Sequence, residues 1–145
     1  MNLRQVSIGA TALLTVAALS LLLRRSLFAH GALLAGIQGA AAALMLWARL
    51  TFRGRSFHAG ANPTSGGLVT TGPYRFVRHP IYTAILLFVW AGVISNGTIL
   101  SVLTAIVATT ALAVRMVAEE ELVLDMYPEY AEYAGHTKRI IPFVL

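Results

Sequence analysis

The chain has 145 residues, of which 57% are hydrophobic and 12% are charged, and its net charge is +5. A domain of this length keeps much of its surface exposed, so it cannot hide that many apolar side chains in a water-soluble core. The absence of cysteine excludes disulfides, thiolate zinc sites and a catalytic thiol. The basic residues lie at the ends of apolar segments and form no single stripe, so we expect membrane lipids as partners and no nucleic acid.

Two apolar segments in the first third of the chain are long enough to cross a bilayer, which takes about 20 residues. Residues 6–23 carry no charge, and residues 27–50 carry one, Arg49, near their end. We interpret the first segment as an anchor, because its apolar run is longer than that of a signal peptide. Residues 1–50 are therefore predicted to form two N-terminal transmembrane helices.

Small residues recur at four-residue steps in the second segment and fall on one helical face. They are Gly31, Ala35, Gly39 and Ala43. Such a face lets another helix approach closely. The partner is expected either within the chain, in the first or fourth apolar segment, or across a homodimer.

A polar loop and a second pair of apolar segments follow. Glycines, prolines and arginines break any helix between residues 51 and 80. Residues 81–95 and 98–117 then predict a hairpin of membrane helices, joined by the Asn96-Gly97 turn and opened by Pro80. The third segment is short for a hydrocarbon core of about 30 Å, so its start is expected below the interface. The sequence predicts an all-α integral membrane protein of about four transmembrane helices.

The end of the chain predicts a cytosolic helical tail. Every acidic residue lies between Glu119 and Glu132, which sets this stretch apart from the apolar segments. Pro128 is expected to split the tail into two short helices. Lysine and arginine concentrate in the 51–80 loop and in both ends of the chain, so the positive-inside rule places both termini and that loop in the cytoplasm.

Three polar features stand out against the apolar background. Residues 68–82 combine turn-forming glycine and proline with Tyr, Arg and His, and residues 127–133 carry three tyrosines. Arg115 lies one helical turn before Glu119 and is followed by three consecutive acids, which exceed what one arginine can neutralise. The excess favours an organic cation. A sulfonium cofactor would also use aromatic faces and arginine or backbone N–H donors.

These features resemble the isoprenylcysteine carboxyl methyltransferase and phospholipid methyltransferase superfamily. The matching residues are Gly72-Pro-Tyr-Arg-Phe-Val-Arg-His-Pro-Ile-Tyr82, Arg115, Glu119-Glu120, Tyr130, Tyr133 and Pro142. The resemblance covers roughly residues 66–145. It implies that residues 51–145 form a cofactor-binding methyltransferase core, with a pocket between the cytosolic ends of the last two membrane helices and the tail.

The resemblance implies S-adenosylmethionine as the cofactor and S-adenosylhomocysteine as its product. It implies cofactor contacts at Gly66, Gly67, Leu68, Val69, Tyr74, His79, Pro80, Ile81, Tyr82 and Glu119. The resemblance implies that Arg115 meets the acceptor, and we expect Arg115 and Glu120 to be the catalytic residues. Ala84 stands where many members have glycine, and the tail is about one residue shorter than usual, which leaves the choice between Glu119 and Glu120 at the cofactor open.

The implied reaction is methyl transfer to a hydrophobic or prenylated acceptor, with the carboxylate of an isoprenylcysteine-type substrate favoured. Arg115 would orient a carboxylate, whereas a phospholipid amine would need a proton acceptor, Glu120 or His79. An NADPH-dependent reductase of the sterol reductase type and a catalytically idle membrane module stay open. Without the resemblance, His79 would be interpreted as a helix cap and the three tyrosines as an interfacial belt. No metal site is predicted, because the other histidines form no ligand spacing with His79.

Overall fold

A computed structural model describes residues 2–52 and 67–141, and these ranges are helical, with no strand among them. The elements are α1 (Leu3–Leu23), α2 (Ala32–Phe52), the short 3-10 helix η1 (Gly72–Arg75), α3 (Pro80–Asn96), α4 (Ile99–Met126) and α5 (Tyr130–His136). The all-α prediction is confirmed. Gly66 and Pro142, both named from the sequence, lie outside the described residues.

Within the described ranges, α1, α2 and α4 are long and apolar enough to cross a membrane. The apolar helix α3 has 17 residues. At 1.5 Å per residue it is about 26 Å long, against a hydrocarbon core of about 30 Å. The prediction of a short third helix is confirmed. A fourth full span and the cytoplasmic placement of both termini stay predictions.

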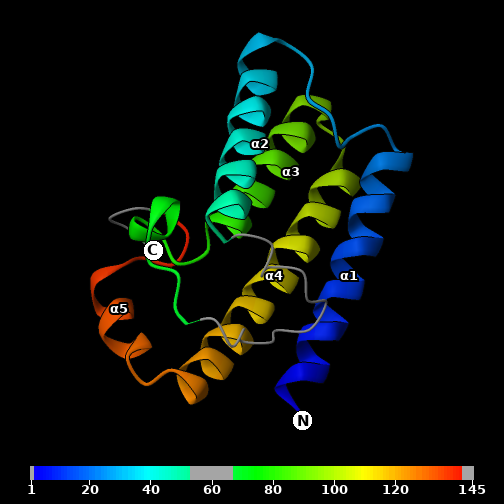
Figure 1. Ribbon diagram of the computed structural model, residues 1–145. Coiled ribbons are helices and arrows are strands. Elements are labelled where there is room, and N and C mark those ends of the chain that lie inside the picture. The colour runs from blue at the N-terminus through cyan, green and yellow to red at the C-terminus, as the bar shows by residue number, and fades with distance from the viewer. Residues whose placement is uncertain (1, 53–66, 142–145) are drawn as a thin grey trace.

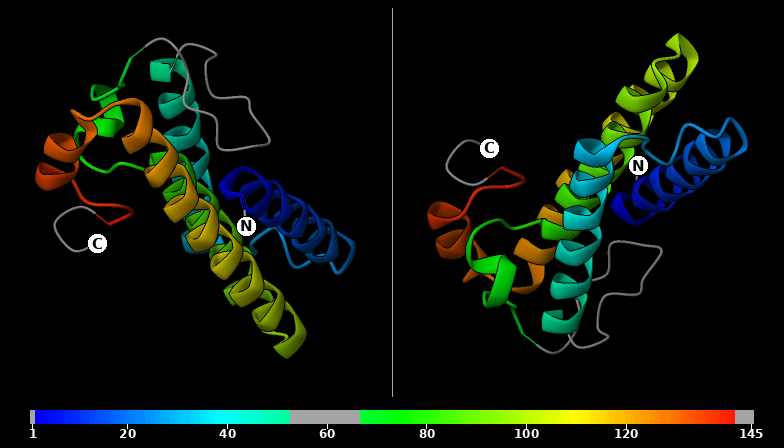
Figure 2. Two further views of the ribbon diagram at one scale, coloured as in Figure 1. Left: turned by 90° about the horizontal axis from the view of Figure 1, so that it is seen from below. Right: turned by 90° about the horizontal axis from the view of Figure 1, so that it is seen from above.

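The four long helices form two antiparallel pairs, in which α1 packs on α4 and α2 packs on α3, while α3 also contacts α4. Figure 1 shows α1 and α3 rising while α2 and α4 descend. In the view from below in Figure 2, α1 lies alongside α4. The start of α1, the end of α2, the start of α3 and the end of α4 therefore share one end of the bundle. We call it the lower end, after its place in Figure 1.

The connection between α1 and α2 is not helical, so α2 begins at Ala32 and not at residue 27 as predicted. The buried side chain of Gln38 explains the difference. Its Oε1 accepts a hydrogen bond from the Ala29 amide at 2.9 Å, and its Nε2 donates to the carbonyls of Leu27 and Phe88, both at 2.8 Å. These bonds satisfy backbone groups that a helix would otherwise pair.

The same connection presses on α3 where that helix has a glycine. A Cβ at Gly92 would lie 2.1 Å from the carbonyl oxygen of Leu27, which is backbone and cannot rotate away. At the end of α3, Gly97 adopts φ +63°, the left-handed conformation that glycine favours. The predicted Asn96-Gly97 turn is confirmed.

The small-residue face of α2 does not make the predicted contact with the first or fourth apolar segment. Gly31, Ala35, Gly39 and Ala43 are all exposed. The helix instead buries Gln38, Ala41 and Ala48 and packs mainly on α3. The prediction of an internal contact through the small face is wrong, and the homodimer stays a prediction.

The acidic stretch continues α4 and does not form a separate helix. The predicted membrane segment ended at residue 117, but α4 runs without a break to Met126. After Pro128 the chain forms one short helix, α5, where two short helices had been predicted for the tail. The acids do not end α4 because Glu119 and Glu120 find partners on neighbouring elements at the lower end.

Candidate active site

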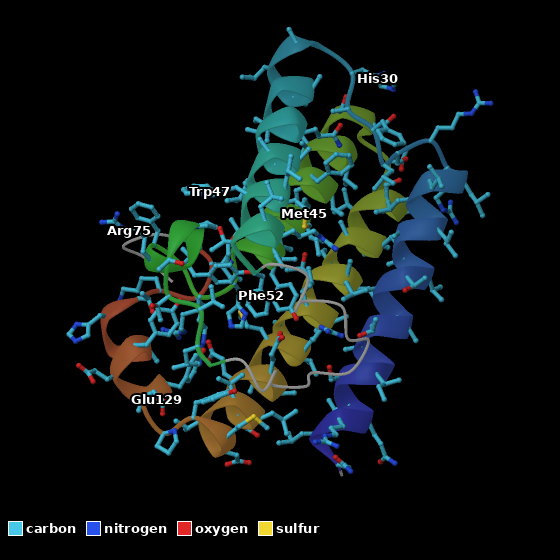
Figure 3. The ribbon with its side chains drawn as sticks, in the orientation of Figure 1. His30, Met45, Trp47, Phe52, Arg75 and Glu129 are labelled. Atoms are coloured by element: carbon cyan, nitrogen blue, oxygen red, sulfur yellow. The ribbon has the colours of Figure 1, made fainter. Side chains whose placement is uncertain are left out.

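The turn before α3 is clamped between α2 and α5. Gly72 has φ +58°, and a Cβ there would lie 2.5 Å from Thr51 Oγ1, so another residue would be strained and would displace the Thr51 side chain. The buried ring of Tyr74 packs on Phe52 with centroids 5.5 Å apart, and Figure 3 labels Phe52 at the lower end of α2. On the other side, the Tyr133 hydroxyl donates to the Tyr74 carbonyl at 2.5 Å. Burial raises the pKa of Tyr133 to about 12, so this donor keeps its proton at an alkaline pH where an exposed tyrosine loses it.

The chain after α5 folds back along the Arg78-His79 dipeptide. The Arg78 amide donates to the Lys138 carbonyl at 2.7 Å, and the His79 amide donates to the Arg139 carbonyl at 3.0 Å. These bonds place the end of the described chain beside the start of α3. The tail contributes Tyr127, Tyr130 and Tyr133 to the wall of the site.

Glu120 is the centre of a buried ion cluster. Its Oε1 accepts a hydrogen bond from Arg78 Nε at 2.9 Å and lies 3.0 Å from His79 Nε2. Its Oε2 lies 2.9 Å from Arg139 Nη2. The Arg78, His79 and Glu120 side chains are 10%, 9% and 12% exposed. Both carboxylate oxygens are therefore held by basic groups, of which only Arg139 is half-exposed.

His79 occupies the cap position of α3, but its side chain makes no capping hydrogen bond. The ring instead meets Glu120 and stacks on Tyr82, with centroids 5.3 Å apart and planes at 7°. The interpretation of the imidazole as a simple helix cap is wrong. His79 connects the ion cluster to the first turn of α3.

A second polar chain links α4, α3 and α1. The Tyr82 hydroxyl donates to Glu119 Oε2. Arg115 Nε donates to the same hydroxyl oxygen at 2.7 Å, and Arg115 Nη1 donates to Thr11 Oγ1. Adjacent glutamates thus have different surroundings, because Glu120 meets basic groups while a phenol holds Glu119.

Both polar groups line a cavity of about 800 Å³, within the range typical of small-molecule sites. Every predicted position that the structure describes contributes to its wall: Gly67, Leu68, Val69, Tyr74, His79, Pro80, Ile81, Tyr82, Arg115, Glu119 and Glu120. Gly66 lies outside the described residues. The turn, the acidic end of α4 and the tail thus all contribute residues to one cavity. That these residues hold a cofactor stays a prediction.

The cavity continues upward between α1, α3 and α4, where most of its wall is apolar. The side chains there include Leu14, Leu21, Ile85, Val89 and Leu112. From Thr11 to Leu21 along α1 is about 15 Å at 1.5 Å per residue. A polar lower part and an apolar upper part therefore belong to one continuous space.

The sequence interpretation missed cavity-lining residues that come from three elements. Thr11 on α1, Arg49 on α2 and Arg78 before α3 all line the cavity. Arg49 had a signal, because a charge inside an apolar segment is rare without a role. Arg78 had one too, since it precedes His79 in the motif. Thr11 had none, because threonine is ordinary in a membrane helix and its partner lies 104 residues away.

Comparisons with known proteins give the family. A family model described as phospholipid methyltransferase matches residues 26–130. The cobalt-zinc-cadmium resistance protein CzcN of Cupriavidus metallidurans is 33% identical over 103 residues, which cover 67% of this chain and 42% of that protein. The nickel-cobalt-cadmium resistance protein NccN of Alcaligenes xylosoxydans xylosoxydans is 30% identical over 98 residues, with the same coverage. The chain thus spans 42% of the length of these curated relatives. The search of solved structures found no match.

The matched range contains α2, η1, α3 and α4, which supply most of the cavity wall, whereas α1 lies outside it. It also contains the ion cluster's Arg78, His79 and Glu120. Together with three apolar helices long enough to cross a bilayer, this match shows that the chain is a membrane protein and belongs to the phospholipid methyltransferase family.

Proposed function

We propose that this protein transfers the methyl group of S-adenosylmethionine to a lipid-like acceptor, and that the acceptor is a carboxylate of the isoprenylcysteine type. Methyltransferases of the family generally use this donor. The observation that carries the proposal is the single cavity whose polar lower part is continuous with an apolar part between membrane helices. Such a space fits a polar cofactor and a hydrocarbon chain side by side.

The donor is proposed to bind against Glu119. Glu120 is already held by Arg78, His79 and Arg139, so its charge is matched within the protein. Glu119 accepts a hydrogen bond from the Tyr82 phenol, which also binds Arg115, and its carboxylate would meet the sulfonium and ammonium groups of the donor. Tyr74 offers an aromatic wall nearby, as a cation requires. We propose Glu120 as a positioning residue that holds the Arg78-His79 turn.

The ion cluster also favours a carboxylate acceptor over an amine. When bound, S-adenosylmethionine supplies an electrophilic methyl group on sulfur. A carboxylate is already ionised at neutral pH and needs no base, so the protein has only to hold it in line and exclude water. An amine must lose a proton, but the two candidate acceptors, Glu120 and His79, are bonded to each other. Arg115 would orient the carboxylate by charge-assisted hydrogen bonds.

A phospholipid amine is the second candidate acceptor, favoured by the description of the matching family. The names of the two relatives concern resistance to metals, not a reaction. Within residues 2–52 and 67–141 no group of three or more His, Cys, Asp or Glu is placed to hold a metal ion, so we propose no metal-binding activity. Two further alternatives, an NADPH-dependent reductase and a catalytically idle membrane module, are distinguished by cofactor-binding experiments.

The proposal is tested with the protein in lipid nanodiscs, a lipid extract and S-adenosylmethionine that carries a deuterated methyl group. Mass spectrometry should find the label in a base-labile methyl ester of a prenylated carboxylate. Label in an amine headgroup would identify the second candidate acceptor, and absence of label from every lipid would contradict methyl transfer. Glu119→Gln should abolish most of the labelling, whereas Glu121→Gln, an exposed neighbour on the same helix, should not.

A further inference from the structure

We propose that Thr11 on α1 is the positioning residue that holds Arg115 ready for the anionic group of the acceptor. The inference rests on the proposed function and gives a role to α1, which lies outside the range that matches the family. It concerns the part of the cavity at Arg115, where the acceptor is proposed to bind, and not the part beside Glu119, where the donor is proposed to bind.

The direction of each hydrogen bond makes Thr11 an acceptor for Arg115. The Thr11 hydroxyl donates its proton to the Ser7 carbonyl at 2.8 Å, one turn back along α1. With that proton committed, the oxygen presents its lone pairs to Arg115 Nη1, which donates to it. Ser7 is fully buried, so the carbonyl that accepts the Thr11 proton is held in place.

The guanidinium is held at a second edge by α3. Arg115 Nε donates to the Tyr82 hydroxyl at 2.7 Å, and that hydroxyl donates in turn to Glu119. Thr11 and Tyr82 therefore fix the plane of the guanidinium from two helices. These two contacts orient the group, and a planar guanidinium in a fixed orientation suits a carboxylate or phosphate.

Arg115 and Thr11 lie where the cavity wall changes from polar to apolar. Leu14 lies one turn above Thr11 on α1, and Leu112 lies one turn above Arg115 on α4, and both line the apolar part. A ligand whose hydrocarbon chain filled that part would bring its anionic head to Arg115. The carboxylate of a prenylated cysteine and the phosphodiester of a phospholipid share this chemistry.

The test compares Thr11→Val, Thr11→Ser and Thr110→Val. Valine keeps the shape of threonine but accepts no hydrogen bond, whereas serine keeps the hydroxyl. Thr110 is an exposed threonine on α4 whose hydroxyl bonds the Ile106 carbonyl of its own helix at 3.0 Å, so it controls for the loss of such a bond. Methyl transfer is measured in nanodiscs with a prenylated N-acetylcysteine in one arm and phosphatidylethanolamine in the other.

Thr11→Val should raise the KM for the accepted lipid about tenfold, as expected for a lost hydrogen bond to a charged group. Its kcat and its affinity for S-adenosylhomocysteine should stay within about twofold of the wild type, since the donor half is untouched. Thr11→Ser should restore the KM. A KM equal to that of Thr110→Val would overturn the proposal. So would an equal loss of S-adenosylhomocysteine affinity, which would indicate a merely structural role.

A failure of the proposed function would look different, because the wild type itself would then methylate neither lipid. In that case the affinity for the prenylated N-acetylcysteine is measured directly by native mass spectrometry. About tenfold weaker binding to Thr11→Val than to the wild type would uphold the positioning of Arg115. Equal binding would overturn it.

Discussion

Replacing Arg78 by alanine should release the C-terminal segment from the site. Arg78 Nε donates to Glu120 at 2.9 Å, and its Nη1 donates to the carbonyls of Ala134 and Thr137 at 2.8 and 2.5 Å. Removing one partner from a buried ion pair costs about 3–5 kcal/mol. Because Arg139 still pairs with Glu120 and His79 still contacts it, we expect the lower value, about 3 kcal/mol.

Hydrogen exchange of residues 130–141 in detergent measures this loss locally. A decrease of about 3 kcal/mol in the free energy of opening makes these amides exchange about a hundredfold faster. Arg75→Ala is the matched control, since Arg75 is exposed, lies over the Phe76 ring at 5.1 Å, and is labelled at the outer edge of the molecule in Figure 3. Exchange in Arg78→Ala no faster than in Arg75→Ala would refute the reasoning.

Two further predictions concern stability. Gly92→Ala should destabilise the protein by about 2 kcal/mol or more, because the added Cβ meets the backbone of Leu27. Gly36→Ala is the control, since a Cβ at Gly36 on α2 meets nothing within 4 Å. Equal thermal midpoints of the two variants in detergent would contradict the prediction. The raised pKa of Tyr133 predicts that its neutral phenol stabilises the fold fully below the ordinary tyrosine pKa of about 10 and that this contribution is lost as the pH rises through about 12. Chemical denaturation should show a smaller loss across that window for Tyr133→Phe, and equal losses in both proteins would argue against it.

The membrane helices could be predicted from the sequence because the hydropathy of a short stretch is enough to identify each of them. Hydropathy located the four apolar segments, and glycine and proline located the turns around α3. It could not locate the start of α2, which depends on Gln38 reaching backbone groups of a neighbouring connection and of α3. It also misplaced the end of α4, because charges end a hydrophobic window but not a helix whose glutamates have partners.

In the site, too, residues that a local sequence pattern carries could be predicted, whereas contacts between distant residues could not. Tyr74, the residues 79–82 and the glutamate pair could be named from the pattern, and they line one cavity, but Arg78 of the same motif was missed. The difference between Glu119 and Glu120 could not, because it depends on Arg139 folding back onto one of them. Thr11 could not be found either, since only the packing of α1 on α4 brings it to Arg115.

The account depends most on the binding of a sulfonium cofactor in the cavity beside Glu119. Calorimetric titration of the detergent-purified protein with S-adenosylmethionine, S-adenosylhomocysteine and NADPH measures this directly. We predict that the first two bind, that Glu119→Gln weakens both about tenfold or more, and that NADPH does not bind. Binding of NADPH alone, or of none of the three, would contradict it.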